Sequence, residues 1–346
     1  GNGYVELASY PKAIRKTDFG YLIVVQSINR RDAALLEINK NGQFEWKETF
    51  RGETQLLDGE ETYSQEIMYD SVKLAEDKYI LLGKYSNFKK TGEWSSELLE
   101  IKNKITYLDR TGGASIKNEY EFEQPAAGDY LNINDLLLAD DKLYAVGAYK
   151  SAVGAGDSSD DNYLPTQGSS GAVLFEINKL DGSINDESVQ TASGLSDRYS
   201  GEAVKTTDGD IYVSYDKNNF AAASVFHSTG QSTDFVQAYG VEYAKLAADD
   251  KNNVYLAGSS GSDYLSSLLV RFTNGVEQAR LSLSKYSRYL SVKTIQYVKR
   301  YGLIVLATDR GKFFGLDTYD SYTVIFNVTD DMQYLAPSTL VTDYGQ

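Results

Sequence analysis

Short apolar runs separated by polar turns recur along the whole chain, and this pattern predicts strands. The runs are near-continuously hydrophobic, which is typical of strands covered on both faces. They return at intervals of roughly 40 to 70 residues, and repeats of about 40 to 50 residues, lengthened by insertions, are typical of β-propeller blades. The six runs are Leu22–Val25, Tyr79–Gly83, Leu143–Gly147, Ile211–Tyr215, Val254–Gly258 and Leu303–Ala307.

Each apolar run is predicted to be the second strand of a four-stranded unit. A half-apolar strand such as Ser71–Leu74 precedes it, and an acidic turn such as Asp140–Lys142 joins the two. A third strand such as Leu36–Asn39 ends in a second polar turn, and a fourth such as Phe44–Phe50 completes the unit. Asp, Asn and Gly suit these turns because they tolerate positive φ.

The repeat therefore predicts an all-β fold, a six-bladed β-propeller of four-stranded antiparallel blades. One domain is expected over residues 1–346, because the repeat runs from end to end. A seventh blade would need more strands than the pattern supplies, so Gly3–Leu7 is expected to complete the sixth blade.

The first unit carries a resemblance. Phe19–Val25, then Asp32–Gly42, then Phe44–Phe50 resemble a repeat of secreted bacterial β-propellers, with a Gly-Gly-Tyr strand, a Gly-Asp strand ending in Asp-x-Asn-Gly, and a Trp-x-Lys-Thr strand. Later units match only in the second strand and the turn after the third, and Arg31 stands where the pattern prefers Gly. The resemblance implies an exported, lipoprotein-like propeller and no catalytic residues.

Charge and composition limit the kinds of partner and chemistry that this protein can have. The formal net charge is −15, which argues against nucleic acid and against an anionic membrane surface. No apolar run approaches the roughly 20 residues of a membrane span. The sequence has no cysteine, so disulfides and thiol chemistry are excluded. No leader is visible, yet we expect an extracellular or cell-surface bacterial protein and a monomer.

Long connections at one end of the predicted blades are the first candidate site. They are Arg51–Tyr69, Asn87–Trp94, Arg110–Tyr130, Ser151–Ser170 and Asp309–Tyr322. They are rich in aromatic side chains, which stack on sugars and on peptide side chains. The alternative is that these rings only pack the connections onto the blades. The predicted ligand-binding residues are Tyr69, Asp70, Trp94, Tyr130, Glu202, Glu242, Phe313 and Tyr319.

Polar residues just before the first strands are the second candidate. They are Lys12, Asp70, Asn134, Glu202, Glu242 and Lys293, and they are expected to line a channel. The favoured function is a non-catalytic module that binds a glycan or a protein partner. The alternative is a carbohydrate-active enzyme with paired carboxylates, because glycosidases need two acids about 5 to 10 Å apart. A further alternative is that these residues only line a solvated channel, which requires neither a bound ligand nor catalysis.

The sequence has few residues suited to a catalytic triad or to a multi-histidine metal site. His227 is the only histidine, which argues against a catalytic triad or a multi-histidine metal site, and it is expected in a turn. The segment Gly154–Asn162 is rich in acids but lacks the order of residues in a calcium loop. A polar loop is the preferred interpretation. We expect no cofactor and no bound metal.

Overall fold

The computed structural model describes most of the chain. The described residues are 9–27, 31–57, 60–92, 95–113, 115–122, 130–150, 170–194, 202–217, 220–228, 232–239, 242–259, 267–283, 290–310 and 321–333. Contacts divide the chain into two compact units, which are described separately. Unit 1 comprises Gly1–Pro125, Leu131–Ala145 and Phe175–Val189, and unit 2 comprises the rest. The expectation of a single domain stays a prediction.

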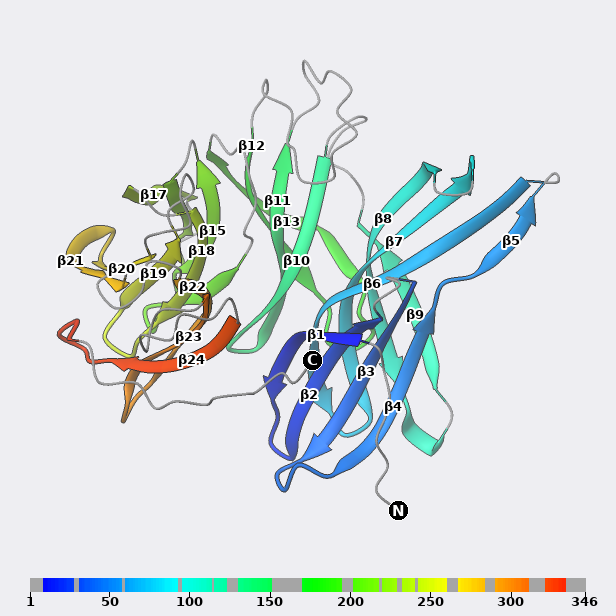
Figure 1. The fold of residues 1–346 in the computed structure, drawn as a ribbon, viewed down its shortest axis with the longest axis horizontal. Helices are drawn as coiled ribbons and strands as arrows, with labels where there is room; N and C mark the ends of the chain where they lie inside the picture. The colour runs from blue at the N-terminus through cyan, green and yellow to red at the C-terminus, as the bar shows by residue number, and fades with distance from the viewer. Residues whose placement is uncertain are drawn as a thin grey trace. The chain divides into compact units, whose positions relative to one another are not determined.

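The strands form six antiparallel sheets that follow one another along the chain (Figure 1). The first sheet holds β1 (Ser9–Lys16), β2 (Gly20–Ser27), β3 (Asp32–Asn39) and β4 (Phe44–Arg51). The second holds β5 (Thr54–Leu57), β6 (Glu60–Ala75), β7 (Lys78–Lys90), β8 (Ser96–Asp109) and β9 (Ile116–Glu121), with a 3-10 turn at Thr111–Gly113. The third holds β10 (Tyr130–Ala139), β11 (Lys142–Lys150), β12 (Ser170–Ile177) and β13 (Ile184–Gly194).

The remaining three sheets repeat the same strand order. The fourth holds β14 (Ala203–Lys205), β15 (Ile211–Lys217), β16 (Phe220–Phe226) and β17 (Ser232–Tyr239). The fifth holds β18 (Glu242–Ala248), β19 (Asn253–Ser259), β20 (Ser267–Thr273) and β21 (Val276–Ser282). The sixth holds β22 (Leu290–Val298), β23 (Gly302–Arg310) and β24 (Ser321–Val328). Three strands of this sheet lie among the described residues. The segment Gly3–Leu7, which was expected to complete it, lies outside them.

Five of the six apolar runs are second strands, and the run in the second sheet lies on β7, which is third because β5 is an additional strand. The predicted fold class is therefore confirmed: the chain is all-β, with the sheets of a six-bladed β-propeller. The described residues contain no helix long and apolar enough to cross a membrane. The predicted turns are present as well, since Asp77, Asp140 and Asn252 have φ of 58°, 54° and 62°. Gly20 is needed for another reason, because a Cβ there would lie 1.9 Å from the carbonyl oxygen of Ile38.

Buried second and third strands supply the core of each unit. In unit 1, Val24 and Leu35 pack with Tyr79 and Leu81, all fully buried. In unit 2, a comparable cluster forms around Tyr255, Val305 and Phe326. The core thus joins neighbouring sheets face to face within a unit, as expected for strands that are apolar on both sides.

The second sheet departs from the sequence prediction. The segments Arg51–Tyr69 and Asn87–Trp94 were expected as loops, but β5, most of β6 and the end of β7 occupy their described parts. The expectation was wrong because polar residues alternate with Tyr63 and Ile67 along β6, as in a strand with one polar face. We call this extension the arm: β5, Glu60–Ile67 of β6, Lys84–Lys90 of β7 and Ser96–Asn103 of β8.

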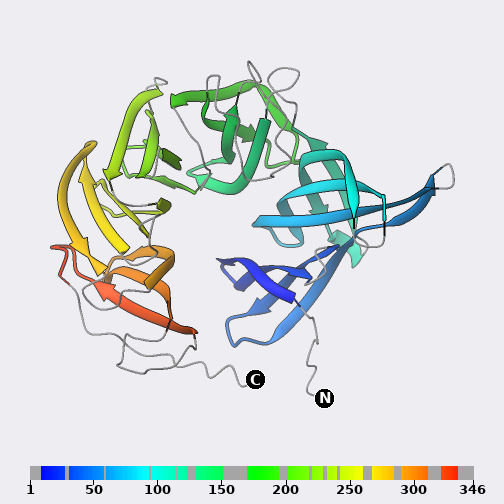
Figure 2. The ribbon, with the colours of Figure 1, turned by 45° about the horizontal axis from the view of Figure 1, so that its top comes forward.

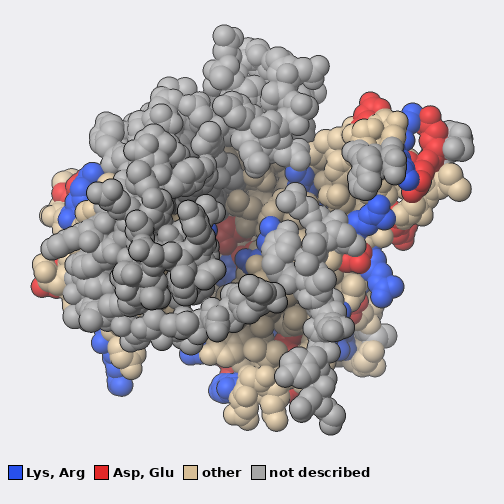
Figure 3. Space-filling model, in the orientation of Figure 1, with Lys and Arg blue, Asp and Glu red and all other residues tan. Residues whose placement is uncertain are grey.

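The arm extends the second sheet beyond β9. Figures 1 and 2 both show the β5–β6 hairpin running outward past the rest of its sheet. The pairing of β6 with β7 continues through it, from Met68 opposite Gly83 to Thr62 opposite Lys89. Its charges are of both signs (Figure 3), with Lys89 close to Glu60 and Lys90 close to Glu61.

Candidate functional site

The structure describes only part of the predicted ligand-binding set. Tyr69 is a half-buried extra residue at a bulge in β6, and Asp70 beside it is buried. Glu202 immediately precedes β14. The others fall outside the described residues: Trp94, Phe313 and Tyr319 entirely, and Tyr130 and Glu242, which begin β10 and β18, in their side chains. The predicted set therefore stays untested as a group.

Asp70 on β6 joins its sheet to the first strands of the sheets before and after it along the chain. Both of its carboxylate oxygens accept hydrogen bonds from the Arg15 guanidinium on β1, one of them at 2.7 Å. Asp70 also accepts a hydrogen bond of 2.9 Å from the backbone N–H of Leu136 on β10. Burial would lower the pKa of Arg15, but Asp70 and Asp135 outweigh it and raise that pKa. The carboxylate is thus saturated by structural partners.

Glu202 makes the corresponding contacts in unit 2. It lies 2.5 Å from Lys245 Nζ on β18 and accepts a hydrogen bond of 3.2 Å from the backbone N–H of Leu246. In both cases a carboxylate binds a cation and a backbone N–H from neighbouring first strands: β1 and β10 for Asp70, and β18 alone for Glu202. Asp70 and Glu202 belong to different units, and each has a local structural role. These contacts weigh against the paired-carboxylate enzyme.

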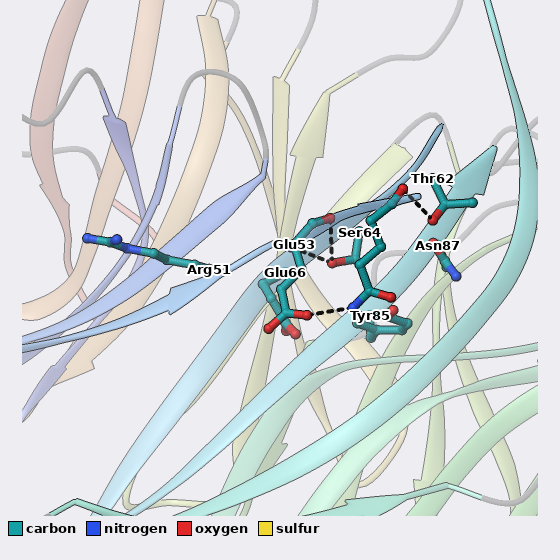
Figure 4. A pocket seen from close by; sticks show the side chains of 8 residues that line it. Arg51, Glu53, Thr62, Ser64, Glu66, Tyr85 and Asn87 are labelled. Carbon is teal, nitrogen blue, oxygen red and sulfur yellow. Dashed lines mark hydrogen bonds between the residues drawn. The ribbon is translucent and has the colours of Figure 1, made fainter. Parts of the chain in front are cut away.

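The arm contains a polar pocket of about 220 Å³. Its lining residues come from the end of β4, from the link to β5, from β5 and from one face of β6 and β7: Arg51, Glu53, Gln55, Thr62, Ser64, Glu66, Tyr85 and Asn87. Glu66 lies opposite Tyr85 and Ser64 opposite Asn87 in the β6–β7 register, which places them on the same face. Figure 4 shows these side chains gathered together, while Arg51 points away from them.

A buried ion pair stabilises the floor of this pocket. Lys104 on β8 is 5% exposed, and its Nζ lies 3.0 Å from Glu66 and 2.9 Å from Glu119. The same Nζ lies 5.7 Å from the centre of the Tyr85 ring, within cation–π range. Burial raises the pKa of Glu66, and Lys104 opposes that rise. Because a buried cation needs its partners, Glu66 holds Lys104 and Tyr85 in place.

A close backbone crossing builds the wall of the pocket. The N–H of Glu53 donates to Ser64 Oγ at 2.7 Å, and the N–H of Ser64 donates to the Glu53 carbonyl at 2.8 Å. A Cβ at Gly52 would lie 2.1 Å from the Ser64 carbonyl oxygen, so only glycine allows this approach. The crossing places Glu53 at the pocket and orders Gln55, whose amide donates to the Glu53 carboxylate at 2.8 Å.

Sequence reasoning missed this pocket because it treated residues 51–69 as a loop. The available signal was the alternation of Thr62, Ser64 and Glu66 along a strand-forming segment. Of the predicted residues, Tyr69 and Asp70 lie further along β6 and do not line the pocket. Tyr63, an aromatic residue of the same predicted loop, stacks on Phe88 with ring centres 5.2 Å apart.

A larger pocket of about 390 Å³ lies beside the turn between β1 and β2. Two of the cations that line it are engaged: Arg15 binds Asp70, and Lys73 lies 2.5 Å from Glu37. Lys73 also lies 5.2 Å from the ring centre of Phe19. These contacts tie β1 and β6 to each other, β6 to β3, and β6 to the turn at Phe19. We therefore consider this pocket a structural junction.

Other predicted sites are simpler. His227 follows β16 directly, as expected, and its Nδ1 lies 2.9 Å from Asp210. Within the described ranges, no group of three or more His, Asp or Glu residues could hold a metal ion. The acidic segment Gly154–Asn162 lies outside those ranges.

Comparison with known proteins identifies the fold. No protein-family model and no curated protein sequence matches the chain. Among solved structures, the Dos1 propeller is similar over 97% of this chain and 86% of its own, with a TM-score of 0.51 and 8% identity.

Two further structures are similar at lower TM-scores. One is the β-propeller domain of the Trilobed protease from Pyrococcus furiosus, with 10% identity, a TM-score of 0.45 and coverage of 96% of this chain and 85% of its own. The other is a quinonprotein alcohol dehydrogenase-like protein from Bacteroides thetaiotaomicron. It has 12% identity and a TM-score of 0.43, and the match covers 96% of this chain and 88% of its own. The likeness to the Dos1 propeller, at 8% identity, shows a propeller fold alone. Membership of the secreted bacterial repeat family stays a prediction.

Proposed function

We propose that this protein is a non-catalytic module that binds a glycan through the pocket of the arm. The observation that carries the proposal is the composition of that pocket: an aromatic ring beside carboxylate, amide and hydroxyl groups. A sugar ring presents a C–H face that stacks on an aromatic side chain. Its hydroxyl groups need both donors and acceptors, which Asn87, Gln55 and Glu53 supply.

The volume of the pocket limits the size of the ligand that it can enclose. Its 220 Å³ is below the roughly 300 to 1,000 Å³ of pockets that enclose a drug-sized ligand. One sugar unit of a longer chain is therefore the expected occupant, with the remainder outside. The floor is preorganised by the Lys104–Glu66 pair, so binding orders few side chains.

Binding without turnover is favoured by what surrounds the acids. Glu66 is held by Lys104 at 3.0 Å, and the predicted acids Asp70 and Glu202 each hold a cation and a backbone N–H. Export and a cell-surface location would fit a glycan ligand, and both remain part of this proposal.

A glycan array with the full chain is the first test, followed by calorimetric titration of the strongest hit. Asn87→Ala removes a donor and an acceptor from the pocket, so we expect roughly fivefold to tenfold weaker binding, from a hydrogen-bond contribution of about 1 kcal/mol. An array without hits from a folded protein would overturn the proposal. Hydrolysis of a bound glycan would favour the enzyme instead.

Gly52→Ala tests the wall of the pocket. Its Cβ would collide with the Ser64 carbonyl, so we expect displacement of residues 51–55 and loss of binding. Gly42→Ala is the control for glycine replacement as such, because a Cβ at Gly42 meets no atom within 4 Å, although its φ of 77° makes the substitution strained. Gly42→Ala should bind like the wild type while folded. Equal binding by a folded Gly52→Ala would contradict the role of the wall.

A further inference from the structure

The charged side chains that face the arm pocket are acidic. Three of its lining residues carry a charge: Arg51, Glu53 and Glu66. Figure 4 shows Arg51 pointing away from the other side chains, whereas Glu53 and Glu66 lie among them. A ligand in the pocket therefore faces two carboxylates, and none of the residues that line the pocket presents a cation to it.

The floor of the pocket keeps an excess of negative charge. Lys104 Nζ lies 3.0 Å from Glu66 and 2.9 Å from Glu119, so two carboxylates share one ammonium group. Oε1 of Glu66 accepts a hydrogen bond from Lys104 at 3.1 Å, whereas Oε2 is buried and has no hydrogen-bond donor among the described residues. Lys117 also acts on Glu66, but it lies 2.8 Å from Glu48. Because charges interact strongly where water is excluded, this floor attracts a cation.

The neighbouring cations on the same face of the sheet are already paired. In the β7–β8 register, Lys102 shares the face of the pocket, and it lies 3.1 Å from Glu100 and 2.9 Å from Glu121. Lys89, further along the same face of β7, lies 2.5 Å from Glu60. These lysines therefore leave the carboxylates of the pocket uncompensated.

Glu53 is the carboxylate that a ligand can reach. It is exposed, and the one described hydrogen bond to its side chain comes from the Gln55 amide at 2.8 Å. It forms no ion pair within the described part of the chain. The bond from its backbone N–H to Ser64 Oγ, at 2.7 Å, fixes its position in the wall. A carboxylate has about four acceptor positions, so most of those of Glu53 remain open to a ligand.

We propose that the sugar unit bound in the arm pocket carries a free amine, and that Glu53 binds its ammonium group. This inference rests on the glycan binding proposed above and narrows the ligand to an amino sugar. Hydrogen bonds between an ammonium group and a carboxylate are roughly twice as strong as neutral ones, whereas uronic acids and sulfated sugars are repelled. The net charge of −15 acts in the same direction, because it attracts cationic ligands over a longer range.

Calorimetric titration of the full chain with three β-1,4-linked tetrasaccharides tests the proposal. Their units are glucosamine, N-acetylglucosamine and glucose, which differ only in the group at C2. The glucosamine tetramer should bind roughly fivefold more tightly than the other two at low salt, a moderate preference because Glu53 is exposed to water. High salt should remove that preference, since it screens exposed charges.

Two variants separate the role of Glu53 from a general effect of charge. Glu53→Gln removes the negative charge and retains the size of the side chain, so the three tetramers should bind alike. Glu61→Gln is the matched control, because Glu61 lies on β6 next to Thr62, points to the opposite face, and pairs with Lys90. Glu61→Gln should keep the preference of the wild type.

The results also distinguish this inference from the glycan proposal. Equal binding of the three tetramers, or an array on which only neutral or acidic glycans bind, would overturn the amino-sugar inference and leave glycan binding in place. An array without hits from a folded protein would overturn both. A preference for the glucosamine tetramer that persists in a folded Glu53→Gln would contradict the role of Glu53.

Discussion

The second and fifth sheets are built from the same repeat and differ in how they use additional residues. β18 to β21 have seven residues each, whereas β6, β7 and β8 have 16, 13 and 14. Both sheets contain an apolar run with fully buried side chains, such as Leu81 on β7 and Leu256 on β19. The extra residues of the second sheet continue its strands in register and create a polar pocket. An insertion into a propeller blade can therefore build a site from strands.

The largest effects are expected in the parts that the two sheets share. Leu81→Ala and Leu256→Ala should each cost about 2 to 5 kcal/mol of unfolding free energy, because both side chains are fully buried. Leu56→Ala in the arm should change the free energy of unfolding by less than about 0.5 kcal/mol, because the Leu56 side chain is 78% exposed. Urea unfolding measures all three. A core-sized loss for Leu56→Ala would show that the arm is part of the folded core.

The two carboxylates that join first strands should differ in strength. Asp70→Asn leaves Arg15 with a weaker partner at a site where the Asp70 side chain is 6% exposed, and should cost about 2 kcal/mol. Glu202→Gln should cost about 1 kcal/mol, since the Lys245 and Glu202 side chains are 24% and 29% exposed and water screens their attraction. Thermal unfolding of the two variants gives the comparison. Equal losses would mean that exposure does not set the strength of these contacts.

Low pH should lower the folding stability of unit 1 because it protonates Glu37. Burial would raise the pKa of Glu37, but the bonds from Lys73, Tyr79 and Trp46 outweigh it and lower that pKa below 4.5. A lowered pKa means that this carboxylate stabilises the fold above about pH 4.5 and that the contribution is lost as the pH falls through the folded-state value. Glu37→Gln should be less stable at neutral pH and should show a shallower decline between pH 5 and pH 3. If the stability of Glu37→Gln declined between pH 5 and pH 3 as steeply as that of the wild type, the role given to Glu37 would be contradicted.

The sequence predicted the repeated parts of the fold and missed the extension of the second sheet, the main departure from the repeat among the described residues. The apolar runs and the turns at Asp77 or Asn252 carry local signals, because burial and positive φ each select particular residue types. The arm was missed because Thr62, Ser64 and Glu66 are polar, and their pairing with β7 is a long-range contact. Asp70 was expected just before a strand and lies inside β6 instead, and its bonds to Arg15 and Leu136 depend on two neighbouring sheets.

The central claim is that the arm pocket binds a sugar, and Tyr85 tests it most directly. The measurement is calorimetric titration of the strongest array ligand against wild type, Tyr85→Ala and Tyr301→Ala, the last a control on a 61% exposed ring outside the pocket. Loss of the stacking surface should weaken binding roughly tenfold in Tyr85→Ala, with Tyr301→Ala like the wild type. A folded Tyr85→Ala that binds with unchanged affinity would contradict the account.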